Sequence, residues 1–171
     1  MANVRYNRST AYGLYEESLF KQAVEKYKKI SCVKSSKEDD IHKHIDFYLG
    51  NGWKVDVKTH KRVNNSDKNV SNEYVWVELM NVRGNKGWID GEATHIGFSL
   101  TTHYILVDRV KLRALVKSKI KSNRWTYKDN NPEPYRIYRR KGLEDKVVLV
   151  PIEDILRIKH YNLQRDNELD H

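Results

Sequence analysis

The sequence is poor in the residues that build covalent or metal-linked scaffolds. It contains one cysteine, Cys32, among 171 residues. It can therefore form no internal disulfide, and it has no Cys-x-x-Cys motif for zinc or redox chemistry. We expect its stability to come from packing and Cys32 to be a half-buried small residue.

Long apolar segments are also missing. No run approaches the length needed to cross a bilayer, and the N-terminal residues MANVRYNRSTAYG lack the apolar core of a signal peptide. We find no internal repeat and no low-complexity tract. These absences predict a cytoplasmic protein with no membrane partner.

The charge of the chain indicates a polyanionic partner. Lys and Arg exceed Asp and Glu by 32 to 23, a net charge of +9, while 39% of the residues are hydrophobic. The composition is that of a folded protein, and the basic excess favours nucleic acid through counterion release. The length predicts a single domain over residues 1–171.

Hydrophobic periodicity predicts an α/β fold with a central mixed sheet flanked by helices. We expect an amphipathic helix over residues 12–30, capped by Ser9 or Thr10, and then a connecting loop at SSKEDD. Strands are predicted at HIDFYL, WKVDVKTHKRV, YVWVELMNV, ATHIGFSL, HYILVDRV and KVVLVP, with helices at 110–120 and IEDILRIK. The expected core is about 12–110, followed by a basic extension, 111–158, and a frayed tail, 159–171. Within the extension, residues 121–142 read as a long surface loop or hairpin.

The turn Gly50-Asn51-Gly52 can close a hairpin in two registers. A two-residue Asn-Gly loop would pair Gly50 with Trp53 and mix apolar and charged side chains on each face. A three-residue loop pairs Leu49 with Trp53, sets Asp46 directly opposite Asp56, and keeps one face apolar. The second register is therefore the prediction.

That register gathers charge on one face of the sheet. His44 would lie opposite Lys58, and Glu78 would join them if the third strand belongs to the same sheet. Opposed carboxylates repel each other unless a divalent cation lies between them. Oxygen ligands of this kind suit Mg²⁺ or Mn²⁺, and Lys58 can neutralise a phosphoryl oxygen or position water. The chemistry implied is phosphodiester hydrolysis.

HIDFYL, the hairpin and VDVK together resemble the PD-(D/E)XK nuclease superfamily. The order of EESLF, SKEDDIHKHIDFYL, VDVKTHK and YVWVELMNVRGNKGWIDGEATHIGF is similar to phage-encoded members of the Holliday-junction-resolvase type. The resemblance covers roughly residues 12–110. Ile45 replaces the proline that names the superfamily, and the acidic residue of VDVK is Asp rather than Glu.

The resemblance implies a restriction-endonuclease-like core and a metal-dependent DNA endonuclease. It makes Asp46 and Asp56 metal ligands, Lys58 the catalytic lysine and Glu17 the helix glutamate, although Glu16 has nearly the same spacing. Such a chain would work in the cytoplasm of a bacterial host. A small basic member also fits structure-selective cutting of branched DNA, which would favour a homodimer.

Two other readings compete with an endonuclease. A nucleic-acid-binding protein could keep the fold without cutting. His42, His44 and Asp46 also share a predicted strand face, as in an iron-binding facial triad, which would need a distant histidine such as His95 or His103.

The basic residues interleaved with aromatic ones predict a DNA-binding surface in either nucleic-acid reading. The candidates for phosphate contact are Lys61, Arg62, Arg83, Lys86, Arg124, Arg139 and Arg140.

Overall fold

The computed structural model describes residues 2–166, with side chains from residue 11 onward, and it has the predicted α/β character. The helices are α1 (Ala2–Ala23), α2 (Lys37–Lys43), α3 (Arg109–Lys119) and α4 (Ile152–Ile155), with a π-helical turn η1 (Val24–Lys28) and a 3-10 turn η2 (Trp88–Asp90). The strands are β1 (Cys32–Lys34), β2 (Phe47–Leu49), β3 (Lys54–Lys58), β4 (Tyr74–Met80), β5 (His95–Ser99), β6 (His103–Asp108), β7 (Trp125–Tyr127), β8 (Ile137–Arg139), β9 (Lys146–Pro151) and β10 (His160–Gln164).

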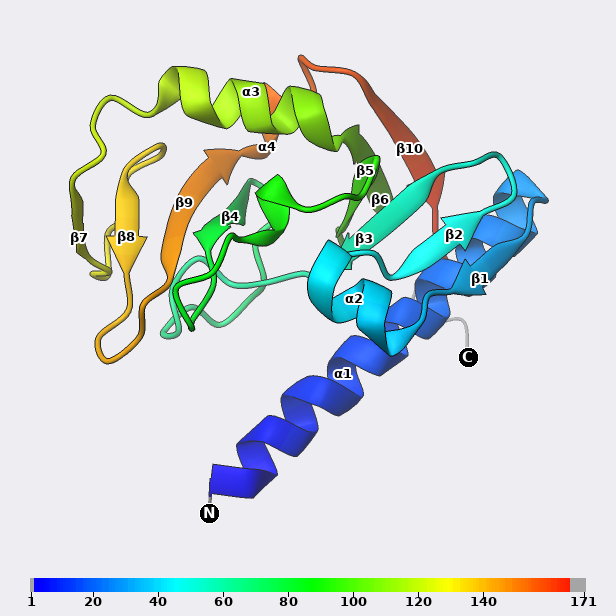
Figure 1. The fold of residues 1–171 in the computed structure, drawn as a ribbon, viewed down its shortest axis with the longest axis horizontal. Helices are drawn as coiled ribbons and strands as arrows, with labels where there is room; N and C mark the ends of the chain where they lie inside the picture. The colour runs from blue at the N-terminus through cyan, green and yellow to red at the C-terminus, as the bar shows by residue number, and fades with distance from the viewer. Residues whose placement is uncertain (1, 167–171) are drawn as a thin grey trace.

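The described strands form two sheets instead of the single central sheet that we predicted. The first has the order β1-β2-β3-β5-β6-β10, with β3 and β5 parallel and the other pairs antiparallel. The second has the order β4-β9-β8-β7, with β7 and β8 parallel (Figure 1). Because β5 occupies the edge of β3, β4 pairs with β9, which lies far along the chain.

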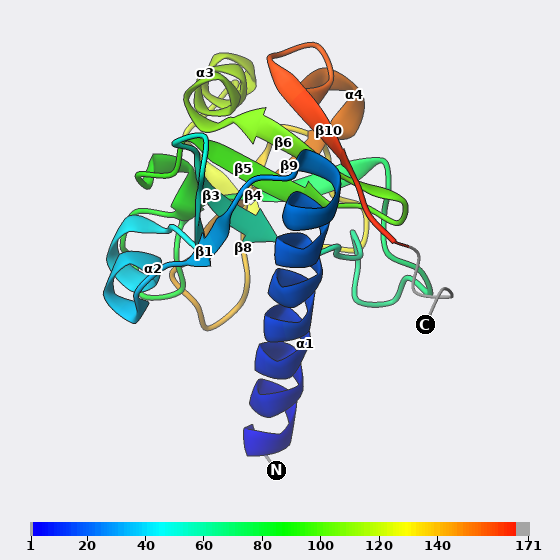
Figure 2. The ribbon, with the colours of Figure 1, turned by 90° about the vertical axis from the view of Figure 1, so that its right-hand side faces the viewer.

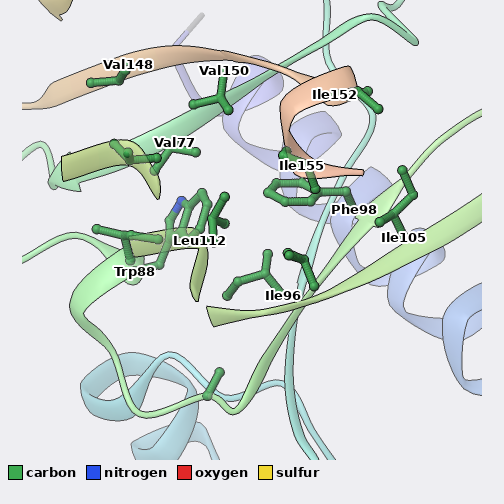
Figure 3. Close-up of a cluster of buried hydrophobic side chains, with 14 of the residues drawn as sticks. Val77, Trp88, Ile96, Phe98, Ile105, Leu112, Val148, Val150, Ile152 and Ile155 are labelled. Carbon is green, nitrogen blue, oxygen red and sulfur yellow. The ribbon is translucent and has the colours of Figure 1, made fainter. Parts of the chain in front are cut away.

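The core consists of two apolar clusters on opposite faces of the first sheet. On one face, Phe20 and Val24 of the α1–η1 segment pack with Val55 and Leu106. The other face contacts the second sheet, in the larger cluster that contains Val77, Trp88, Ile96, Phe98, Leu112 and Val148 (Figure 3). Both faces of the first sheet are therefore covered, so a polar side chain on β3 can be shielded from solvent.

The N-terminal third differs from the prediction at both helices. α1 begins at Ala2, so Ser9 and Thr10 lie within the helix and do not cap it. The N-terminal half of α1 extends away from the sheets (Figure 2). The expected SSKEDD loop is in part helix α2, whose N-cap Ser36 accepts a hydrogen bond from the Asp39 NH at 3.1 Å.

The C-terminal third is more ordered than the sequence indicated. The expected loop over residues 121–142 contributes strands β7 and β8 to the second sheet. In the expected frayed tail, β10 pairs with β6, while residues 167–171 lie outside the described part of the chain. Cys32 is buried and not half-buried. None of the described helices combines the length and apolar character that spanning a bilayer requires.

Candidate active site

The hairpin of β2 and β3 has the predicted three-residue turn. Phe47 lies opposite Val55, and the Leu49 NH donates to the Trp53 carbonyl at 2.8 Å. Gly52 closes the turn with φ 89°, a conformation that favours glycine. The register predicted from the sequence is therefore confirmed.

Asp46 is held against β3, although not as a member of a strand pair. β2 begins one residue later, at Phe47, so the predicted direct pairing of Asp46 with Asp56 does not form. Instead the Asp46 NH donates to the Val55 carbonyl at 2.9 Å, and its Oδ2 accepts from the Val57 NH at 2.7 Å. These two bonds bind Asp46 to the backbone on either side of Asp56.

Asp56 is a buried carboxylate that is only half satisfied. It is 3% exposed, and its Oδ1 lies 2.8 Å from the Nζ of Lys58. Its Oδ2 is buried without a hydrogen-bond partner among the described residues. Burial raises the pKa of Asp56 to about 8, and the nearby charge of Asp46 adds to this, while Lys58 opposes it. A proton or a bound cation would satisfy the unpartnered oxygen.

Lys58 emerges two residues later on the same face of β3 and remains charged. Burial lowers the pKa of Lys58, but the carboxylates of Asp56, Asp46 and Glu78 outweigh burial and the pKa is raised. Its Nζ also lies 5.0 Å from the centre of the Trp88 ring. The ammonium is therefore a fixed positive charge beside the two aspartates.

Glu78 reaches this region from the second sheet, because β4 is not part of the first. The condition for a common sheet face, that the third strand joins the first sheet, is thus not met, yet Glu78 still interacts electrostatically with Lys58. Burial raises the pKa of Glu78, and the charges of Lys58 and Lys61 oppose this rise. Gly87 allows the close approach of the next loop, because a Cβ there would lie 2.2 Å from the Glu78 carbonyl oxygen.

The two glutamates of α1 face different partners. Glu16 is 1% exposed, accepts from Ser99 Oγ at 3.0 Å, and lies 3.5 Å from Arg165. Glu17 instead accepts from the Nζ of Lys34 at 2.7 Å, and the same Nζ lies 3.7 Å from Asp46 Oδ1. Of the two, Glu17 is connected to the aspartates, through a lysine that sequence reasoning missed.

Asp40 is a second residue that sequence reasoning missed. It belongs to α2, in the stretch expected to be a loop. Burial raises the pKa of Asp40 to about 6, followed by the negative charge of Asp46. The spacing of Ser36 and Asp39, typical of a helix N-cap followed by acidic residues, was the signal that could have placed Asp40 on a helix.

The carboxylates do not yet form a complete metal site. Among the described residues, no three His, Cys, Asp or Glu side chains are grouped so that they could hold a metal ion. The positive charge beside Asp46 and Asp56 comes instead from Lys34 and Lys58.

The histidines do not form the iron-binding arrangement considered above. His42 lies in α2 and His44 is its C-cap with φ 53°, so they do not share a strand face with Asp46. Burial, followed by the charge of Lys58, lowers the pKa of His44. Its position beside the carboxylate site is consistent with a neutral lining residue.

A small cavity opens next to Lys58, where the parallel strands β3 and β5 end. Its lining comes from both sheets and includes Lys58, His60, Lys61, Trp76 and Ser99. His60 is fixed by a 2.8 Å hydrogen bond between its Nε2 and the Ser71 carbonyl, and burial lowers its pKa. Lys58 thus forms part of the wall of this cavity.

The residues predicted to contact nucleic acid come from the loops after β3 and β4 and from the region of the second sheet. In the loops after β3 and β4, the side chains of Lys61, Arg83 and Lys86 are exposed. Arg62 instead donates a hydrogen bond to the Asp67 carbonyl at 3.0 Å.

The other candidates are carried by the second sheet. Arg139 lies 4.5 Å from the centre of the Trp125 ring and donates to the Leu143 carbonyl. Arg140 pairs with buried Asp145 at 2.7 Å. Arg124 is exposed and lines a large groove. Arg140 interacts electrostatically with Lys61 near the site, whereas Arg124 lines a groove that contains none of the site residues.

No protein-family model, curated protein or solved structure matches this chain.

Proposed function

We propose that this protein is a metal-dependent endonuclease that hydrolyses phosphodiester bonds in DNA. The observation that carries the proposal is the buried, unpartnered Oδ2 of Asp56, held close to Asp46 and with Lys58 on the other oxygen. Burying a carboxylate oxygen without a hydrogen-bond partner lowers the stability of a sheet, so folding alone does not explain this group. A divalent cation would reverse the repulsion between the two aspartates.

The donor set fits Mg²⁺ or Mn²⁺, with Asp46 and Asp56 as the residues that would hold it. A bound ion of this kind supplies Lewis acidity toward phosphoryl oxygens and lowers the pKa of bound water. Lys58 supplies a positive charge at the mouth of the adjoining cavity, where it can bind a phosphoryl oxygen. Glu17 is available as a further ligand only when Lys34 releases it.

The finer parts of the proposal rest on the resemblance given above. They are membership of the PD-(D/E)XK superfamily, a restriction-endonuclease-like core, DNA as the substrate, preference for branched DNA and a homodimeric state. The α1 helix beside a mixed sheet and the β2–β3 hairpin are compatible with that core. Cleavage of four-way junctions and linear duplex at equal rates would remove the branched-DNA preference.

The decisive experiment is nicking of supercoiled plasmid with Mg²⁺ or Mn²⁺ by the native protein, Asp56→Asn and Lys58→Met. Lys54→Met is the matched control for the lysine, because Lys54 is an exposed residue of the same strand. Glu92→Gln is the control for the carboxylate, because Glu92 is exposed. We expect nicking by the native protein and both controls, and a loss of at least a hundredfold in the two site variants.

A second function is favoured by one observation. Lys34 and Lys58 already compensate the carboxylates, and the described residues contain no complete metal-binding group. This suits a nucleic-acid-binding protein that does not cut. It would bind DNA equally well with EDTA and with Mg²⁺, would lose affinity in salt, and would leave plasmid intact under every metal condition.

A further inference from the structure

A large cavity lies away from the aspartates, at the opposite edge of the second sheet from β4. It is a groove of about 720 Å³ between the end of α3, strand β7 and the segment before β8. We call it the basic groove and define it by Lys119, Lys121, Arg124, Trp125, Tyr135 and Arg136. Its volume is within the range of pockets that hold small ligands.

The basic groove carries uncompensated positive charge. Four of its lining residues are Lys or Arg and one, Glu133, is acidic. In the part of the chain with described side chains, neither Lys121 nor Arg124 forms an ion pair. The Arg136 guanidinium comes no closer than 4.0 Å to the Glu133 carboxylate, which is a weak contact.

An aromatic side chain lies among these cations. Trp125 is 39% exposed, more than the other three tryptophans, and it lies on β7, the edge strand of the second sheet. The Arg139 guanidinium lies 4.5 Å from its ring centre, and Tyr127 contacts it edge-on. The indole is thus held in place while a large part of its surface remains open.

The wall of the basic groove is held in a strained conformation. Tyr135 has φ 62°, which bulky side chains rarely adopt. Its NH donates to the Leu149 carbonyl at 3.0 Å, and its hydroxyl donates to Asp154 at 2.6 Å. Lys119 contacts the same Asp154 at 3.3 Å. Strain that is fixed from several sides occurs preferentially at binding sites.

From these features we propose that the basic groove binds an unpaired segment of DNA. Phosphates would lie against Lys121, Arg124 and Arg136, and a base would stack on Trp125. An unpaired strand offers both groups together, whereas a duplex keeps its bases stacked away from such an indole. The groove would be a second contact for the substrate of the endonuclease, and in that role it rests on the function proposed above.

Binding is tested by fluorescence anisotropy with a labelled oligo-dT strand in EDTA, so that no cleavage occurs. We compare the native protein with Trp125→Ala and with the pair Arg124→Gln/Arg136→Gln. The matched control is Lys28→Gln/Lys111→Gln, which removes two exposed charges outside the groove.

We expect about tenfold weaker binding or more for Trp125→Ala. The groove pair should reduce the slope of log affinity against log salt by about 1.4, since each lost phosphate contact removes about 0.7. The control pair should change affinity by less than about threefold under the same electrostatic principle. Equal losses in the groove and control pairs, or tighter binding of duplex than of single strand by the native protein, would overturn the inference.

The same assay separates this inference from the endonuclease proposal. Glu92→Gln should bind oligo-dT as the native protein does, because Glu92 is exposed and lies outside the groove. If the native protein binds through the groove but never nicks plasmid, only the endonuclease proposal fails. If it nicks plasmid while the groove variants bind oligo-dT normally, only the groove inference fails.

Discussion

The burial of Asp56 makes a quantitative prediction about folding stability. Its pKa rises from 3.8 to about 8 on folding, first because of burial. Between these values the unfolded chain has lost the proton and the folded chain has kept it, so stability falls as pH rises. The slope is about 1.4 kcal/mol for each pH unit, or about 2.7 kcal/mol between pH 5 and pH 7.

The assay is urea unfolding at pH 5, 6 and 7 in EDTA, with circular dichroism as the probe. Asp56→Asn is the comparison, because it removes the titrating group and leaves the other ionisable residues in place. It also leaves the Lys58 ammonium without its partner, which shifts the whole curve. In that variant burial lowers the pKa of Lys58, while the charges of Asp46 and Glu78 still raise it.

We therefore expect the native protein to lose stability relative to Asp56→Asn as the pH rises from 5 to 7. Glu92→Gln, which changes an exposed carboxylate, should follow the native curve. Parallel curves for the native protein and Asp56→Asn would refute the reasoning, because they would mean that Asp56 is ionised in the folded state across this range.

Three further predictions follow from single contacts. Mn²⁺ at a hundred times its dissociation constant should stabilise the native protein by about 2.7 kcal/mol, and calorimetry should find no such gain in Asp56→Asn. Gly87→Ala should destabilise the protein by about 1–3 kcal/mol in urea, because its Cβ would meet the Glu78 carbonyl. Gly13→Ala is its control: a Cβ there meets nothing within 4 Å, so it should stabilise helix α1 by about 0.5–1 kcal/mol. Ser36→Ala should cost about 1 kcal/mol in the same assay, because it removes the N-cap of α2.

Sequence reasoning succeeded where the decisive interactions are local. Alternation with a period of two places Asp56 and Lys58 on one face of β3, and their 2.8 Å ion pair agrees with this. The turn residues and the apolar pattern select the hairpin register, because the other register would have mixed the faces. The basic helix α3 and the strands β5, β6 and β9 were predictable for the same reason.

It failed where a short segment depends on a distant partner. β10 is polar along most of its length, but it pairs with β6 and buries Leu163. The strands β7 and β8 are three residues each and carry too little pattern to be recognised. Glu78 was expected near Lys58 as part of the same sheet. It does interact with Lys58, but from β4 of the second sheet.

The chain's own order of residues determined which carboxylates and which lysine share the β2–β3 hairpin, because strand alternation and turn geometry act over a few residues. Tertiary structure decided how those groups behave. Solvent exclusion around Asp56 depends on contacts with the second sheet, which is built from segments far apart in sequence. Those contacts raise the pKa of Asp56 and leave its Oδ2 without a partner. They also bring Lys34 between Glu17 and Asp46, an arrangement that no local pattern contains.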